Sequence, residues 1–184
     1  MSAQLAVLGL LAEGPAHGYA LERLIEERGM RKWASIGSSS IYYVLGRMVS
    51  EELAEVDVVA APGRGPRRKV HTITRRGRAV WEGRAIDAIT DTDAPAEEFL
   101  LAIAGFPLLD PAKAGAALEC RVSELDARIE GLAADRREAA PFPGHVEAMF
   151  DLTLARLVTD RSWTRSFLQD QYGQPSPQRK EETP

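Results

Sequence analysis

Residues 38–48 read SSSIYYVLGRM, and the stretch joins a helical apolar pattern to a set of hydroxyl, aromatic and cationic groups. Ile41, Val44, Leu45 and Met48 follow the i, i+3, i+4, i+7 spacing that places side chains on one face of a helix. Burial of that face holds the helix against a core. The hydroxyl, aromatic and cationic side chains on the other side are not needed for this packing. The stretch therefore predicts an amphipathic helix with a specialised outer face.

That outer face suits contact with a polyanion. The side chains that point away from the buried stripe or lie on its flanks are Ser39, Ser40, Tyr42, Tyr43, Gly46, Arg47 and Ser50. The hydroxyl of Ser38 or Ser39 is expected to cap the first turn, and hydroxyls and amides at a helix N-terminus suit phosphate oxygens. Tyr43 is expected to face DNA, whereas Tyr42 either contacts DNA or fills a gap between helices. Arg47 either reaches a phosphate or guanine edge or is a solvated charge.

Helices precede this stretch and a hairpin follows it. The expected elements are helices over 2–12 and 19–28, the helix at 38–48, strands over 54–60 and 69–74, and a helix over 75–89. Gly14-Pro15 ends the first helix, and the connector over 30–37 places Trp33 and Ile36 in the core. Three helices followed by a basic hairpin are the plan of a winged helix-turn-helix, whose third helix enters the DNA major groove. The wing is expected to have two strands.

The charge of the chain is unevenly distributed. Between residues 64 and 84 lie eight basic residues and one acid, a formal charge of +7, whereas the whole chain carries −4 and the remainder therefore −11. A basic island on an acidic protein favours a local polyanion contact, although a solvated surface is the alternative. Arg64, Arg67, Arg68 and Lys69 in the wing are expected to follow the DNA backbone or enter the minor groove.

Composition limits the class of protein. The 184 residues are 45% hydrophobic and 27% charged, and no apolar run reaches the length of a membrane span. The first apolar stretch has no basic segment before it, so it predicts a helix and not a signal peptide, and the cytoplasm is the expected location. The single cysteine, Cys120, is expected to be buried and inert, with a redox role as the alternative. His17, His71 and His145 lack the spacing of metal ligands, and no catalytic motif is present, so we expect no enzyme, metal or cofactor.

The second half of the chain is helical and predicts dimerisation. The segment 91–96 is expected to be a hinge, followed by a short helix over 95–106 and a helix that begins at Asp110-Pro111. Apolar residues in that helix step by 4, 3, 4 and 3 as Leu118, Val122, Leu125, Ile129 and Leu132. This seam fits either a coiled-coil contact or an intrachain bundle. A last helix over 145–172 carries two apolar stripes, which indicates two packing partners, one of them a second subunit.

Three segments of the chain resemble the PadR family of bacterial transcription regulators. They read LGLLAEGPAHGYALERLIEE, SSSIYYVLGRM and GRGPRRKVHTITRRGRAVW, and they contain the GPxHGY turn, the S-x-I-Y helix opening and the R-K-x-H-x-I-T-x-x-G strand. The resemblance covers about residues 3–82 and implies a homodimer that binds an inverted-repeat operator, usually as a repressor relieved by a small molecule. The positions that carry over are Tyr19, Ser38, Ser39, Ser40, Tyr42, Tyr43, Arg47 and the wing basics. Gly46 departs from the family, where many relatives hold a polar or charged residue.

The expected protein is thus mainly α (α+β), with three parts. Residues 1–92 form the winged-helix DNA-binding domain, 93–172 the helical dimerisation and effector region, and 173–184 a disordered tail. The function expected is a sequence-specific, homodimeric repressor released by a small apolar or aromatic effector, for which Trp163 and Phe167 are candidate contacts unless they form plain dimer core. The alternative is a winged-helix module that binds protein and not specific DNA.

Overall fold

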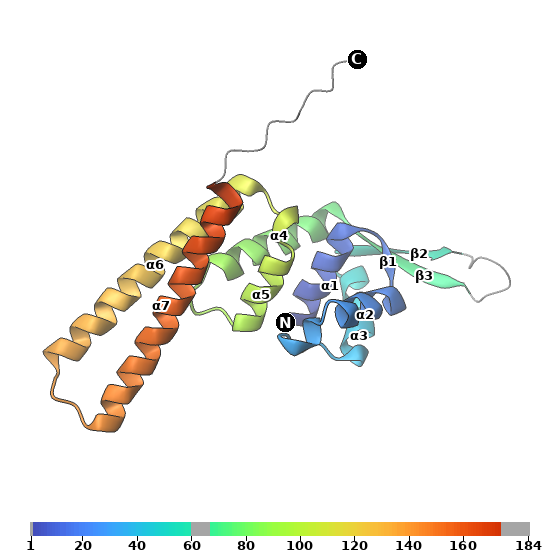
Figure 1. Ribbon diagram of the computed structural model, residues 1–184. Helices are drawn as coiled ribbons and strands as arrows, with labels where there is room; N and C mark the ends of the chain where they lie inside the picture. The colour runs from blue at the N-terminus through green and yellow to red at the C-terminus, as the bar shows by residue number, and fades with distance from the viewer. Residues whose placement is uncertain (1, 60–66, 174–184) are drawn as a thin grey trace, which may run out of the picture. The chain divides into compact units, whose positions relative to one another are not determined.

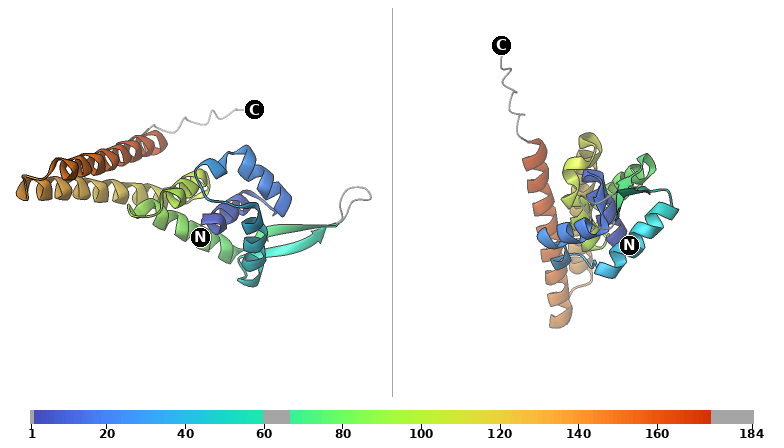
Figure 2. Two further views of the ribbon diagram at one scale, coloured as in Figure 1. Left: turned by 90° about the horizontal axis from the view of Figure 1, so that it is seen from below. Right: turned by 90° about the vertical axis from the view of Figure 1, so that its right-hand side faces the viewer.

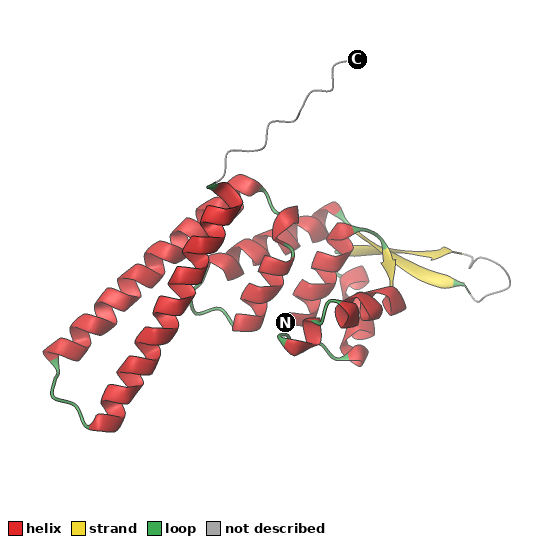
Figure 3. Cartoon of the chain, in the orientation of Figure 1, coloured by secondary structure: helices red, strands yellow, loops and turns green. Residues whose placement is uncertain are grey.

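The computed structural model describes residues 2–59 and 67–173. The chain forms two compact units, Met1–Ala114 and Gly115–Pro184. Figure 1 labels the elements, and Figure 3 shows that they are helices apart from one small sheet. No helix in the described part of the chain is long and apolar enough to cross a membrane.

The N-terminal unit is built around its first helix. Its elements are α1 (Ser2–Glu13), β1 (Ala16–His17), α2 (Gly18–Glu27), η1 (Met30–Lys32), α3 (Ser38–Ser50), β2 (Ala54–Val59), β3 (Arg68–Ile73), α4 (Arg75–Thr90), α5 (Ala96–Ala104) and η2 (Phe106–Leu108). Helix α1 is apolar on almost every side and packs against α3, α4 and α5. An all-round apolar helix must be central, and Leu5, Leu8 and Leu11 are accordingly buried.

The sheet has three strands and not the expected two. Its order is β1-β3-β2, with both neighbours antiparallel to β3. The added strand β1 is only two residues long, and Ala16 pairs with His71 while His17 pairs with Val70. A strand this short carries no period-two pattern, so the sequence showed only the Gly14-Pro15 break there. The wing is thereby tied to the start of α2.

Two glycines of the family-like motifs are required by close approaches. A Cβ at Gly18 would lie 2.6 Å from Cε1 of Tyr42, so the glycine lets α3 pack against the start of α2. A Cβ at Gly77 would lie 2.0 Å from the carbonyl oxygen of Leu53, which excludes any side chain there. Thr74 caps α4 by accepting the Gly77 amide at 2.9 Å. The I-T-x-x-G pattern is therefore a helix cap joined to a backbone contact.

The C-terminal unit is an antiparallel helical hairpin (Figure 2). Helix α6 spans Pro111–Glu138, with its last 24 residues in this unit, and α7 spans Gly144–Tyr172. Ion pairs cross the hairpin: Arg121 meets Asp160 at 2.7 Å, and Arg161 meets Asp126 at 3.1 Å. In the expected seam of α6, Leu118 and Leu125 are buried. Cys120 is exposed, which contradicts the expected burial, because it lies outside that seam.

The two apolar stripes of α7 differ in exposure. The first stripe, Val146, Phe150, Leu154, Leu157 and Leu168, is half-buried throughout. In the second, Met149, Leu152 and Trp163 are exposed and Phe167 is half-buried. The single chain therefore covers one stripe and leaves the other largely open.

The compact N-terminal unit ends at Ala114, beyond the expected domain limit at 92. Helix α5 packs against α1 and α4, so it belongs to the first unit by packing. The division into a DNA-binding part and a dimerisation part is a functional one and stays a prediction. The expected disordered tail includes Gly173, while 174–184 lie outside the described residues.

Candidate nucleic-acid interface

Helix α3 presents the expected outer face. Ile41, Val44, Leu45 and Met48 are buried, which confirms the predicted stripe. Tyr43 is 67% exposed on the opposite side. Four buried apolar residues hold the helix in place, so the Tyr43 side chain is not needed in the core. It is accessible to a partner.

The start of α3 differs from the expectation. Gly37 is the N-cap residue and no side chain caps it, so neither Ser38 nor Ser39 has the predicted role. The Ser40 hydroxyl donates to the Gly37 carbonyl, and the Ser38 hydroxyl accepts from Arg31 at 3.1 Å. The first amides of α3 therefore have no side-chain acceptor in the described structure. Such amides, at the positive end of the helix dipole, are suited to a phosphate oxygen.

Arg31 holds the connector that leads into α3, and the sequence analysis missed it. Its guanidinium donates to the Ile36 carbonyl at 2.6 Å and to Ser38, and it forms ion pairs with Glu22 at 3.7 Å and Glu26 at 3.1 Å. These contacts join α2, η1 and α3. The only sequence signal was a cation between two helices, which by itself does not name its partners.

The two adjacent tyrosines have different surroundings. The Tyr42 ring lies against Gly18 on α2, although 55% of the residue is exposed. It therefore packs between helices while keeping an accessible side, and both sequence alternatives remain available to it. Tyr43 lies one turn before Arg47. Glu51 is the main cause of the raised pKa of the Arg47 guanidinium, and Tyr43 makes a smaller contribution in the same direction.

Arg47 is paired within its own helix. Its guanidinium lies 2.7 Å from the Glu51 carboxylate, four residues on. The hydrogen bond from Arg47 lowers the pKa of Glu51, with a smaller contribution from Gln4, whose amide donates at 3.1 Å. The i, i+4 spacing was readable in the sequence. Only its Nε and Nη2 donate to Glu51, so a contact of Arg47 with DNA would use Nη1 or replace this carboxylate.

A cleft beside the wing gathers several of the predicted residues. It measures about 320 Å³ and is lined by His17, Gly18, Tyr19, Tyr42, Arg68, Lys69 and His71. Tyr19 is 67% exposed, and its ring stacks with that of His17 at a centroid distance of 6.3 Å. His17 caps α2, because its Nδ1 accepts the Ala20 amide at 2.9 Å, and its Nε2 lies 3.5 Å from Arg68. Aromatic and cationic groups from α2, α3 and β3 thus converge at one place.

The remaining predicted residues are more scattered. Arg67 precedes β3 and is exposed beside Arg68, while Arg64 lies outside the described residues. Ser38 and Ser39 lie at the start of α3 and Arg47 toward its end, so α3 itself connects them. Trp163 and Phe167 belong to the other unit and stack on each other with centroids 5.0 Å apart. Among the described residues, no acidic, histidine or cysteine cluster could hold a metal ion.

His71 is the buried titratable group beneath the cleft. It is 8% exposed on the central strand β3. Burial lowers its pKa, a hydrogen bond with the Ala16 backbone opposes this, and Lys69 adds to it. Folding of the wing therefore favours the neutral imidazole over the protonated one.

Residues 7–82 match the model of the Transcriptional regulator PadR-like family. Among solved structures, the chain is similar to Bacillus subtilis PadR in complex with operator DNA, at 20% identity over 91% of this chain and 98% of that chain, with a TM-score of 0.43. It is similar to smu.1604c from Streptococcus mutans UA159, at 16% identity over 91% and 99%, with a TM-score of 0.43. It is also similar to Bacillus subtilis PadR in complex with p-coumaric acid, at 20% identity over 93% and 99%, with a TM-score of 0.41.

The comparison with curated proteins gives no significant match. The family model covers α2, α3 and the sheet, together with most of α1 and the first half of α4. These elements contain the cleft and the exposed face of α3. The match to the transcriptional regulator PadR-like family therefore falls on the part of the chain that carries the candidate interface, residues 7–82.

Proposed function

We propose that the protein is a sequence-specific, double-stranded DNA-binding transcription regulator that acts as a homodimeric repressor. The observation that carries the proposal is the family match over 7–82, a segment that includes the exposed residues Tyr43, Arg68 and Lys69. In the proposed complex α3 enters the major groove, and the wing cations contact phosphates. Phosphate contacts set the register, while side chains of α3 read base edges.

The proposed operator is an inverted repeat read by two copies of the chain. The exposed stripe of α7, with Met149, Leu152 and Trp163, is the surface we assign to the second copy. Two-fold related subunits present two identical reading helices, and their spacing sets the half-site spacing. The proposed effector is a small apolar or aromatic molecule that changes this spacing, with Trp163 and Phe167 as candidate contacts.

Selection of DNA from a random pool by the purified full-length protein tests the function. We expect a selected sequence with two-fold symmetry, bound by a dimer. Retention of all sequences alike, or of none at low salt, would contradict sequence-specific DNA binding. Either result would favour the alternative, a winged-helix module that binds protein and not specific DNA. The same proposed function places the protein in the cytoplasm.

The salt dependence of binding tests the wing. Replacing Arg67 and Arg68 with Ala should weaken binding to all DNA sequences alike, and it should reduce the slope of log affinity against log salt by about one for each phosphate that is no longer neutralised. The Tyr43→Ala variant is the matched comparison, since it should lower affinity for the selected operator more than for random DNA. An unchanged slope in the double variant would remove these two arginines from the interface.

A further inference from the structure

The middle of helix α3 carries no side chain on its exposed side. At about 100° per residue from the buried stripe, the side of α3 opposite the core is formed by Ser39, Tyr43, Gly46 and Ser50. Gly46 is exposed, and a Cβ built there would have no atom of the described chain within 4 Å. Packing therefore does not require this glycine, in contrast to Gly77.

An open glycine in a helix is not by itself a site, because the chain has others. Gly83 on α4 and Gly131 on α6 are equally open. Gly46 differs from both because it lies on the helix that we propose enters the major groove. In homeodomains, side chains at i, i+3, i+4 and i+7 of the recognition helix read that groove. Counted from Ser39, Tyr43 lies at i+4 and Gly46 at i+7, so Gly46 occupies a reading position.

The rest of this face does not favour guanine. The most common specific contact with guanine uses two donors of one arginine or lysine on O6 and N7. Arg47 is the only cation of α3, all of which the structure describes, and its Nε and Nη2 donate to Glu51 at 3.1 and 2.7 Å. Gln4 of α1 donates to the same carboxylate at 3.1 Å and holds it in place. The remaining nitrogen of Arg47, Nη1, cannot present two parallel N–H groups by itself.

An open position on a groove-facing helix suits the methyl group of thymine. Thymine presents this apolar C5-methyl group in the major groove, where apolar groups of a protein contact it. At Gly46 the missing side chain leaves room for the methyl group against the helix backbone. The exposed ring of Tyr43, one turn earlier on the same face, supplies an apolar wall beside it.

We propose that Gly46 is a specificity-determining residue, which selects thymine in each operator half-site by admitting its C5-methyl group. A Cβ at this position would occupy the place of the methyl group. The inference rests on the proposed DNA-binding function and adds to it one base and one residue.

Replacement of thymine by deoxyuridine tests the methyl group alone, because the two bases differ only at C5. The probe is a synthetic duplex with the sequence that the full-length protein selects from a random pool. Deoxyuridine replaces one symmetric pair of thymines at a time. We expect at least one pair at which loss of the two methyl groups weakens binding by about tenfold.

Gly46→Ala separates this role from a structural one. Alanine is the better helix former and meets no neighbour, so the Tm should rise by about 2–4 °C. Affinity for the thymine duplex should nevertheless fall by about fivefold or more, because the Cβ takes the place of the methyl group. The variant should bind the thymine and deoxyuridine duplexes within about twofold of each other. Gly83→Ala is the matched control, with the same gain in helix propensity outside α3, and should bind both duplexes as the parent protein does.

Gly46→Arg adds a cation at the same position. In a new selection from the random pool, we expect guanine in place of thymine at the affected base pair, because arginine donates to O6 and N7. Three results would overturn the inference: parental affinity of Gly46→Ala for the thymine duplex, an equal deoxyuridine penalty in the parent protein and Gly46→Ala, or an unchanged sequence selected by Gly46→Arg. Failure of the parent protein to select any DNA would instead contradict the proposed function.

Discussion

The two compact units use apolar and charged side chains in opposite ways. In the N-terminal unit, α1 is enclosed by α3, α4 and α5, and the cations Arg68 and Lys69 remain outside. In the C-terminal hairpin, Arg121 is buried against Asp160, while Met149 and Leu152 of α7 are exposed. The first unit thus completes its core within one chain and presents charge. The second joins its helices partly by charge and presents an apolar stripe, which is the surface expected for another protein chain.

The same substitution in the two units should have very different costs. Leu8→Ala empties a fully buried position in α1 and should lower the free energy of unfolding of the N-terminal unit by about 3 kcal/mol. Leu152→Ala removes a side chain that is 54% exposed, so it should change monomer stability by less than about 1 kcal/mol and weaken self-association instead. Urea unfolding and sedimentation velocity measure the two effects. Equal losses of stability in the two variants would contradict the proposed difference between a closed core in the first unit and an open apolar stripe in the second.

Glycine substitutions in α4 test how closely the first unit is packed. Gly77→Ala should lower stability by about 2 kcal/mol, because its Cβ would meet the Leu53 carbonyl. Gly83→Ala, in the same helix, has open space around it and should raise stability by about 0.5–1 kcal/mol. Thermal unfolding of both variants provides the measurement. A tolerated Gly77→Ala would mean that β2 and α4 can separate at little cost.

Charge removal tests the hairpin. Asp160→Asn removes the carboxylate that lies 2.7 Å from Arg121, and since only 6% of that arginine side chain is exposed, stability should fall by about 1–2 kcal/mol. The expected loss of stability is smaller than for a fully buried ion pair, because 33% of the Asp160 side chain is exposed. Asp151→Asn, at an exposed pair with Arg136, should have a much smaller effect. Similar losses from both variants would show that burial does not set the strength of these pairs.

The smallest expected effect is a pH dependence of stability that originates at His71 in the wing. Because burial lowers the pKa of His71, the unfolded chain takes up a proton on this side chain at a higher pH than the folded chain does. The melting temperature of the N-terminal unit should therefore fall as pH decreases from about 7.5 to about 5.5, and the fall should be smaller in His71→Gln. Glu51 and Glu97 have lowered pKa values, so their contribution is lost only at more acidic pH. A His71→Gln variant with the parent slope would exclude His71 as the source.

The helices and the outer face of α3 could be predicted from the sequence because both depend on local periodicity. Ile41, Val44, Leu45 and Met48 mark the buried side of α3, and Tyr43 follows as exposed from geometry alone. The predicted serine cap was wrong, because a serine hydroxyl near a helix start can form a hydrogen bond with another group in place of a first-turn amide. Ser40 donates to Gly37, and Ser38 accepts from Arg31, a residue on the preceding connector.

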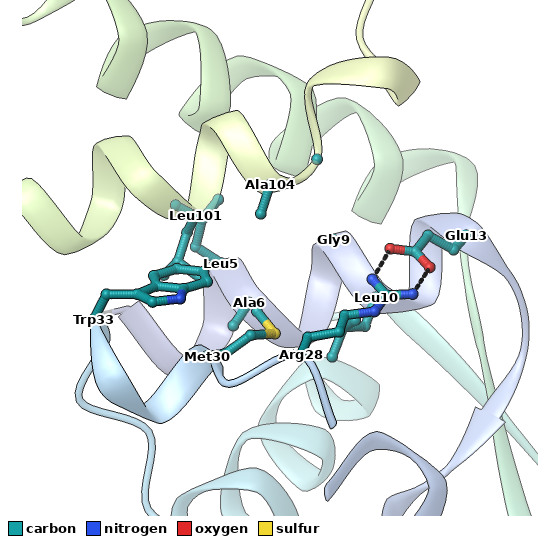
Figure 4. A pocket seen from close by; sticks show the side chains of 11 residues that line it. Leu5, Ala6, Gly9, Leu10, Glu13, Arg28, Met30, Trp33, Leu101 and Ala104 are labelled. Carbon is teal, nitrogen blue, oxygen red and sulfur yellow. Dashed lines mark hydrogen bonds and ion pairs between the residues drawn. The ribbon is translucent and has the colours of Figure 1, made fainter. Parts of the chain in front are cut away.

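What the sequence by itself determined is the order of the main elements, the basic wing and the buried side of α3, because these follow from spacing along the chain. Only the tertiary structure decided which distant residues meet. Strand β1 joins the sheet through Ala16 and His71, Tyr42 covers Gly18, and Trp33 closes a pocket beside Leu101 (Figure 4). Each of these contacts joins segments far apart in sequence. Their existence depends on how helices of fixed shape pack around α1, a property that no local pattern encodes.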